Sequence, residues 1–184
     1  MKYFTSDWHL GDDRIGINGK PNLFYRPFSS VAEQDREIFN RIDFSGIEAG
    51  DTLYHLGDVF YNEGDFQMHI MENIKKRLKS VKMILIEGNY DVGKTDLLSN
   101  FFDDIKDSDN VEIGGNTFYL NHYPVNCIGS EPSLTGHIHG LWKVQKGMIN
   151  VGVDAWHFMP VSEETILFCW NAMQNHYDEN VFIK

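Results

Sequence analysis

Residues 81–86, VKMILI, run directly into residues 87–91, EGNYD, and this junction decides the class of fold. A nearly continuous apolar run of this length is typical of a strand that is covered on both faces. The polar residues after it are typical of a ligand-carrying strand end, because ligands gather at the carboxyl ends of the strands in α/β sheets. The junction therefore predicts a buried strand of an α/β domain, with chemistry at its end.

Strands and helices alternate on the amino-terminal side of this junction. A capping box and apolar residues at helical spacing predict a helix over residues 31–42, and similar spacing predicts another over residues 66–78. Short β-prone runs at residues 2–6 and 52–56 also end in acids or histidines. This alternation predicts an α/β domain with a parallel portion.

The second half of the chain is predicted to be mostly β-structure. We expect a hairpin with a glycine-rich turn over residues 111–120, and further short strands at 148–153 and 165–170. Glycine, proline and asparagine recur over residues 10–28, which predicts a long irregular loop. The sequence shows no internal repeat or linker, so we expect a single domain over residues 1–184.

The composition narrows the possible partners and location. A formal net charge of −11 argues against sequence-independent binding to duplex nucleic acid, which requires clustered Lys and Arg. It does not exclude a small anionic substrate, because bound cations can make a site locally positive. No apolar run is long enough to span a membrane and no signal-peptide pattern is present, so we expect a cytoplasmic protein without a membrane partner. Cys127 and Cys169 are expected to be free thiols.

The stretch Gly136-His137-Ile138-His139-Gly140 carries two histidines at i and i+2. In an extended segment such residues project to the same side, so the pair is predicted to face one point. Imidazole is a ligand for Zn, Fe and Ni, and with carboxylates for Mn. Taken alone, the pattern fits two surface histidines equally well.

Ligand-capable side chains stand at each predicted strand end, namely Asp7, His9, Asp58, Asn89, His122, His137 and His139. In this order they resemble the signature of the calcineurin-like metallophosphoesterases: D-x-H, G-D, G-N-H-D/E, a single His, and G-H-x-H. The wider sequence resembles the small phosphoesterases of bacteria and their phages. The expected fold is accordingly a four-layer αββα sandwich, with two mixed β-sheets flanked by helices.

The resemblance implies a binuclear centre of divalent cations, from Mn, Fe, Ni or Zn, with Mn favoured. One cation would be held by Asp7, His9, Asp58 and His139. The other would be held by Asp58, Asn89, His122 and His137, with Asp58 bridging. Two such metals activate a bridging water as hydroxide and clamp a phosphoryl group, which implies hydrolysis of a small or nucleotide-like phosphoester.

Residue 90 departs from the family pattern, because Tyr90 stands where the family has His. Tyrosine is a neutral donor at pH 7 and is less well matched to protonating an alkoxide leaving group. We therefore predict a phosphodiesterase, with Tyr90 and Asp91 as catalytic residues. The alternatives are a phosphomonoesterase, a nuclease, or a non-catalytic metal-binding scaffold. Arg26 and Arg14 are candidates for phosphate contacts, each with a solvated loop arginine as the alternative.

Overall fold

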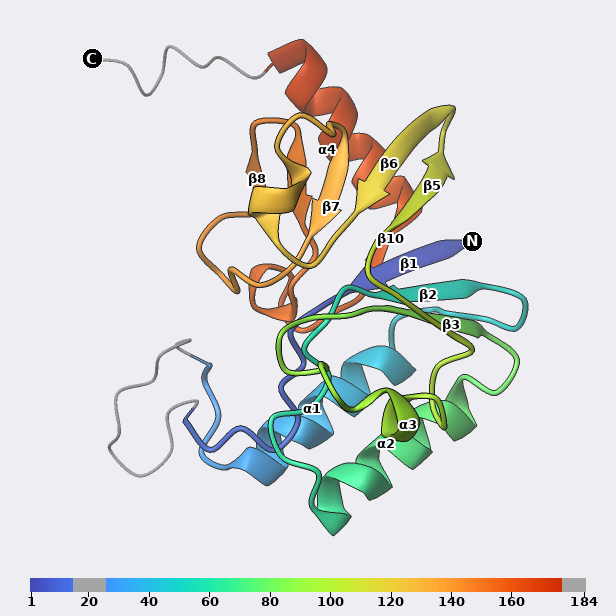
Figure 1. Cartoon of the computed structure of the whole chain (residues 1–184), viewed down its shortest axis with the longest axis vertical. Helices are drawn as coiled ribbons and strands as arrows, with labels where there is room; N and C mark the ends of the chain where they lie inside the picture. Colours follow the sequence, from blue (N-terminus) through green and yellow to red (C-terminus); the bar gives the residue numbers. More distant parts are fainter. Residues whose placement is uncertain (15–25, 177–184) are drawn as a thin grey trace.

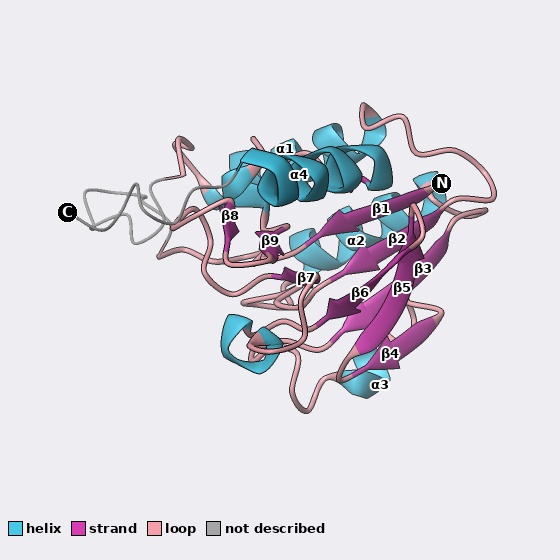
Figure 2. Cartoon of the chain, turned by 90° about the horizontal axis from the view of Figure 1, so that it is seen from above, coloured by secondary structure: helices cyan, strands magenta, loops and turns pink. Residues whose placement is uncertain are grey.

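The computed structural model describes residues 1–14 and 26–176, and it contains two packed β-sheets with helices (Figure 1). The first sheet has the strand order β10 (Val161–Ser162), β1 (Lys2–Thr5), β2 (Thr52–His55), β3 (Lys82–Ile86) and β4 (Asp104–Lys106). Strands β1 to β4 are parallel, and β10 pairs antiparallel with β1. The carboxyl ends of β1, β2 and β3 therefore lie at one edge of the sheet, where they run side by side (Figure 2).

The second sheet is also mixed. Its order is β5 (Asp109–Ile113), β6 (Asn116–Leu120), β7 (Ser133–Thr135), β9 (Met148–Asn150) and β8 (Val144–Gln145). The pairs β6–β7 and β7–β9 are parallel, and the two outer pairs are antiparallel. The strand predicted over residues 148–153 ends at Asn150 and is followed by a short 3₁₀ turn, η2 (Val153–Ala155).

The helices are α1 (Val31–Asp43), α2 (Asp65–Arg77), α3 (Thr95–Leu98) and α4 (Glu163–His176), with a further 3₁₀ turn η1 (Pro124–Cys127). Helices α1 and α2 cover the face of the first sheet that points away from the second sheet (Figure 1). Ser30 caps α1, since its Oγ accepts the amide of Glu33 at 3.1 Å. The predicted class of two mixed sheets flanked by helices, and the helices expected over 31–42 and 66–78, are confirmed.

Residues that follow each other along a strand of the first sheet belong to different cores, because successive side chains of a strand point to opposite faces. One core lies between the sheet and the helices and includes Tyr3, Leu53, Met83, Ile38 and Ile74. The other core lies between the two sheets and includes Phe4, Tyr54, Ile84, Phe118 and Ile149. Packing on both faces fixes the strands, and with them the loops that leave their carboxyl ends.

The strand predicted over residues 165–170 is wrong, because these residues lie in α4. Ile166 is fully buried, whereas Phe168, which a strand would place on the same face, is 73% exposed. Helix α4 packs against β1, β9 and β10. Apolar residues are so frequent at 165–170 that they show no distinct helical period. The signals of a helix start were nevertheless present, since the hydroxyl of Ser162 caps the helix and two acids occupy its first turn.

Three further expectations concern the loop over residues 10–28, the cysteines and membrane-spanning helices. Most of the loop predicted over residues 10–28 lies outside the described residues. Cys127 and Cys169 are free, as predicted. Within the described ranges, no helix has the combination of length and apolarity needed to cross a bilayer.

Candidate metal centre

The candidate ligands come from loops that follow strands of both sheets. Asp7 and His9 follow β1, Asp58 follows β2, and Asn89 follows β3. His122 follows β6 of the second sheet, and His137 and His139 follow β7. The structure gathers six of these residues into two groups, in each of which the ligand atoms lie within 4.8 Å of one another. The first group is Asp7, His9 and His139, and the second group is Asp58, His122 and His137.

Asp58 stands between the two groups. Its Oδ2 lies 3.3 Å from Nε2 of His9 and 3.5 Å from Nε2 of His122. Its Oδ1 accepts the amide of Tyr90 at 2.9 Å, which fixes the plane of the carboxylate. Burial raises the pKa of Asp58, but the hydrogen bonds of His122 and His9 outweigh burial and hold this pKa well below its usual range. An ionised carboxylate in this position fits a ligand shared by two cations.

Candidate ligands occupy an unfavourable backbone conformation. The φ angles are +59° at Asp7, +47° at His9, +63° at Asp58, +72° at His137 and +50° at His139. Left-handed conformations at residues other than glycine cost about 1–3 kcal/mol each and cluster at functional sites. The segment that carries His137 and His139 is therefore a turn. The extended backbone from which their shared orientation was predicted is wrong.

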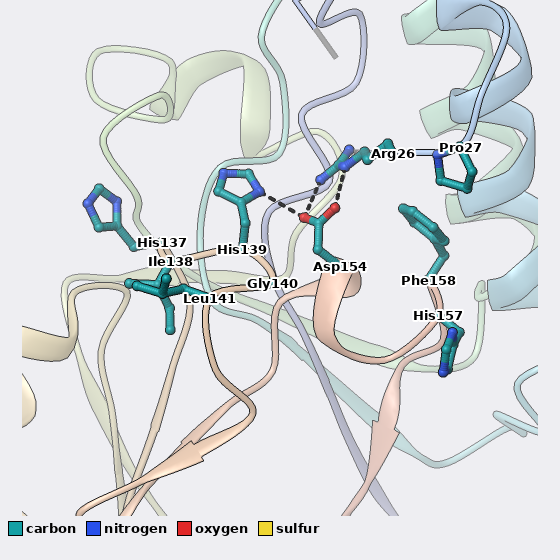
Figure 3. Close-up of a pocket in the computed structure, with 10 residues that line it drawn as sticks. All are labelled: Arg26, Pro27, His137, Ile138, His139, Gly140, Leu141, Asp154, His157 and Phe158. Carbon is teal, nitrogen blue, oxygen red and sulfur yellow. Dashed lines mark hydrogen bonds and ion pairs between the residues drawn. The ribbon is translucent and has the colours of Figure 1, made fainter. Parts of the chain in front are cut away.

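His139 is fixed by residues distant in the sequence (Figure 3). Its Nδ1 lies 2.8 Å from Oδ2 of Asp154, and Asp154 accepts two hydrogen bonds from Arg26, at 2.7 and 2.9 Å. Burial raises the pKa of Asp154, but the charge of Arg26 outweighs burial and holds this pKa well below its usual range. A carboxylate that accepts a hydrogen bond from one imidazole nitrogen fixes the orientation of the ring and leaves the other nitrogen for a metal.

Arg26 was predicted to bind substrate, and its observed contacts are within the chain. Besides Asp154, the guanidinium donates to the carbonyl oxygens of Trp8 and Asp7, at 2.9 and 2.5 Å. Its side chain is fully buried. These contacts tie the loop after β1 to Asp154 and so to His139.

His122 is fixed in the same way by the backbone. Its Nδ1 lies 2.6 Å from the carbonyl oxygen of Leu56, so Nδ1 is the donor and Nε2 faces the centre. Burial lowers the pKa of His122, but the hydrogen bond to Asp58 and the charges of Asp7 and Asp58 raise it to about 9. The carboxylates of the centre thus attract positive charge, and a divalent cation can take the place of that proton.

Asp91 was predicted to be a catalytic residue, and in the structure its carboxylate binds backbone amides. It is fully buried and accepts the amides of Asp58 and Gly88, at 2.7 and 2.9 Å. A Cβ at Gly88 would lie 2.3 Å from Oδ1 of Asp58, so only glycine allows this approach. Asn89 follows on the exposed surface of the same loop. Asp91 therefore positions the backbone around the shared carboxylate.

Two carboxylates of this region were missed from the sequence. Asp154, the partner of His139, follows a β-prone run, so the rule that located the other strand-end ligands could have found it. Asp12 lies beside His9, with Oδ2 3.9 Å from Nδ1 of the imidazole, and pairs with Arg14. Only its short distance from the Asp7-Trp8-His9 motif could have suggested a role.

A pocket of about 730 Å³ adjoins both groups (Figure 3). His137 and His139 line one side of it, together with the apolar side chains of Ile138 and Leu141. The opposite side includes His157 and Phe158, which also have left-handed backbone, with φ of +54° and +65°. The strained backbone therefore extends from the candidate ligands to the wall of the neighbouring pocket.

The sequence matches the family model described as calcineurin-like phosphoesterase over residues 3–178. A solved structure of a protein of unknown function from Aquifex aeolicus is similar, with a TM-score of 0.68 and 25% identity over 92% of this chain and 98% of that chain. The nuclease MPE from Pseudomonas putida has a TM-score of 0.53 and 23% identity, over 75% of this chain and 61% of that chain. This second likeness concerns the fold alone. The curated proteins include no significant match.

Proposed function

The chain belongs to the calcineurin-like phosphoesterase family, and from this premise we propose that it hydrolyses a small phosphodiester with two divalent cations. The general class, a metal-dependent phosphoester hydrolase, follows from the family. One observation carries the binuclear proposal. Oδ2 of Asp58 lies within 3.5 Å of a histidine nitrogen of each ligand group, namely Nε2 of His9 in the first group and Nε2 of His122 in the second.

The donor sets fit divalent cations of the first transition row. The first cation would be held by Asp7, His9, Asp58 and His139. The second would be held by Asp58, Asn89, His122 and His137. Mixed carboxylate, amide and imidazole ligands suit Mn, Fe, Ni and Zn, and we propose Mn. Two such cations, when bound, would lower the pKa of a shared water and polarise the phosphoryl group.

The contribution of the chain itself is to hold the ligands in place before any cation arrives. Asp154 orients His139, the carbonyl of Leu56 orients His122, and the amide of Tyr90 orients Asp58. Such outer contacts commonly account for 10- to 100-fold in metal affinity or activity, a rough general range. Asp91 acts as a positioning residue, since its carboxylate binds the amide of Asp58.

Two observations support a diester over a monoester or a polynucleotide. The pocket that begins at His137 and His139 offers space for a second ester group, and its charged lining residues Arg26 and Asp154 are paired with each other. A net charge of −11 disfavours a long polyanion. We therefore propose a substrate with an uncharged organic group, such as a nucleoside, on its second ester oxygen.

The test is metal-dependent turnover of two related esters. Protein stripped with a chelator is reloaded with Mn, Fe(II), Ni, Zn or Mg, and hydrolysis of bis(p-nitrophenyl) phosphate is compared with that of p-nitrophenyl phosphate. We expect Mn to restore hydrolysis, with the diester preferred. His139→Gln should abolish it, and His69→Gln, at an exposed histidine of α2, should not. Faster hydrolysis of the monoester would contradict the substrate class, and no bound metal and no turnover would contradict the function.

We further propose that residues 1–184 form one domain that works in the cytoplasm. The family match over residues 3–178 supports the first proposal. The free thiols of Cys127 and Cys169 support the second, because reducing compartments keep thiols unpaired.

A further inference from the structure

A cluster of polar and aromatic side chains lies beside the first group and is not used by the proposed metal ligands. Arg14 is its centre. Nε and Nη2 of Arg14 donate to the two carboxylate oxygens of Asp12, at 2.9 and 2.7 Å. Nη2 also donates to the hydroxyl oxygen of Tyr90 at 3.0 Å, and Cζ lies 4.0 Å from the centroid of the Tyr61 ring. The guanidinium is therefore held on three sides.

This cluster is attached to the candidate metal ligands. The rings of Tyr90 and His9 lie edge to face, with centroids 5.0 Å apart. The backbone amide of Tyr90 binds Asp58, and Oδ2 of Asp12 lies 3.9 Å from Nδ1 of His9. Any group bound between Asp58 and His9 thus lies close to the phenol of Tyr90.

Two hydrogen-bond donors of the cluster remain available. The guanidinium has five N–H groups, and its bonds to Asp12 and Tyr90 use Nε and Nη2. Nη1 of Arg14 has no hydrogen-bond partner among the residues that the structure describes, and the side chain is 34% exposed. Because the oxygen of Tyr90 accepts from Arg14, its hydroxyl hydrogen is left to donate to another group. The cluster therefore offers a cationic donor and a neutral donor beside the same centre.

We infer that Arg14 binds a non-bridging oxygen of the substrate phosphoryl group through Nη1 and directs the Tyr90 hydroxyl to the same phosphoryl group. This inference rests on the proposed function and adds a residue to it. Guanidinium groups match phosphate oxygens in geometry and charge, and Arg14 supplies a permanent positive charge where tyrosine replaces an ionisable histidine. Asp12 keeps the guanidinium in place and leaves its outer edge for the substrate.

The test compares four variants with a matched control. The variants are Arg14→Gln, Arg14→Lys, Tyr90→Phe and the double variant Arg14→Gln/Tyr90→Phe. The control is Arg41→Gln, because Arg41 also binds a carboxylate, that of Glu37 at 2.6 Å, and lies on α1. Each protein is loaded with Mn and its metal content is measured. Inhibition by inorganic phosphate and hydrolysis of aryl diesters with leaving groups of different pKa are then compared.

We expect Arg14→Gln to weaken phosphate inhibition and to lower kcat/KM by roughly 10- to 100-fold, the range for a charge-assisted hydrogen bond. Arg14→Lys should restore only part of this loss, because an ammonium group cannot bind Asp12 at two points and Tyr90 together. The double variant should lose less than the product of the single losses, since Arg14 directs Tyr90. Tyr90→Phe should change the dependence of rate on leaving-group pKa.

The inference is overturned if Arg14→Gln and Arg41→Gln have the same phosphate inhibition and kcat/KM at full metal content. It is also overturned if Arg14→Lys, checked by thermal unfolding, matches the unsubstituted protein in both measurements. Should the unsubstituted protein hydrolyse no ester, the proposed function fails. Calorimetric titration of the Mn-loaded protein with inorganic phosphate would then still test Arg14, because binding needs no turnover.

Discussion

The two ligand groups differ in how firmly the protein holds them. In the first group Asp7 and His9 are buried, and His139 is tied to Asp154. In the second group His137 is exposed. The ring contacts of His137 are with His122 and Tyr123, which belong to the same loops as the ligands. We therefore expect the first group to be the better formed of the two, whereas a cation at the second group would have to order His137.

The largest effect should come from Asp58→Asn, which would weaken both ligand groups at once. Asparagine keeps the shape of the side chain but removes the charge that both groups share. We expect metal content to fall at both sites and diester hydrolysis to fall by about 10³-fold or more, at or above the range for losing one stabilising donor. Mass spectrometry of bound metal and turnover measure these effects. Asp65→Asn, at the first turn of α2, is the control, and two retained metals in Asp58→Asn would contradict the bridging role.

Asp154→Asn should affect the first group alone. The substitution removes the carboxylate that orients His139 and pairs with Arg26. We expect the tighter metal affinity to fall by roughly 10- to 100-fold, with little change in the weaker one. Titration of the metal-free protein with Mn measures both affinities. Equal losses at both sites would show that the groups are not separately supported.

His137→Gln should have a smaller effect, confined to the second group. The histidine is exposed, so water can replace its nitrogen at low cost, and we expect the weaker affinity to fall on the order of tenfold. The control is His157→Gln, at an exposed histidine of the neighbouring pocket. If His137→Gln weakened the tighter site more than the weaker one, the assignment of the groups would be wrong.

The smallest effect concerns Asp35, which binds the segment that follows His9. This buried carboxylate accepts the amide of Gly11 and, at 2.9 Å, Nε2 of Gln67. Burial raises the pKa of Asp35, although these hydrogen bonds lower it in part. The folded protein therefore binds this proton more tightly than the unfolded chain does. The resulting stability is full below the unfolded pKa and is lost as pH rises through the folded pKa.

Asp35→Asn should remove that part of the pH dependence. The free energy of unfolding of the variant, relative to the unsubstituted protein, should rise as pH increases from acid to neutral. Urea unfolding of the two metal-free proteins over this range measures the difference. A difference that stays flat with pH would show that Asp35 does not carry the effect.

The sequence predicted the first half of the fold better than the second. The runs predicted at residues 2–6, 52–56 and 81–86 contain the strands β1, β2 and β3, because each run is short and β-prone and is followed at once by polar residues. Helix α4 was missed because apolar residues are so frequent at 165–170 that both periods fit. Tertiary packing, which places Phe168 in solvent, decides between them.

The same contrast holds for the centre. The residues that form the two groups could be predicted, because ligands follow strand ends and strand ends can be located locally. The pairing of Arg26 with Asp154 joins positions 128 residues apart. The pairing of Asp154 with His139 depends on β7 and β9 lying side by side in the second sheet. The sequence indicated which residue types carry the chemistry. It could not indicate how the residues that orient them are paired in the fold.

Because the candidate ligands have left-handed backbone, engineering for thermal stability and engineering for metal binding favour different residues at these positions. Asparagine and glycine tolerate this conformation better than histidine does, so substitution by either at His137 or His139 should relieve local strain. A screen of variants for thermal stability alone would therefore favour losing these histidines. Any stabilised form of this enzyme must be selected for metal binding at the same time, because greater stability of the fold and retention of the centre lead to different residues at these positions.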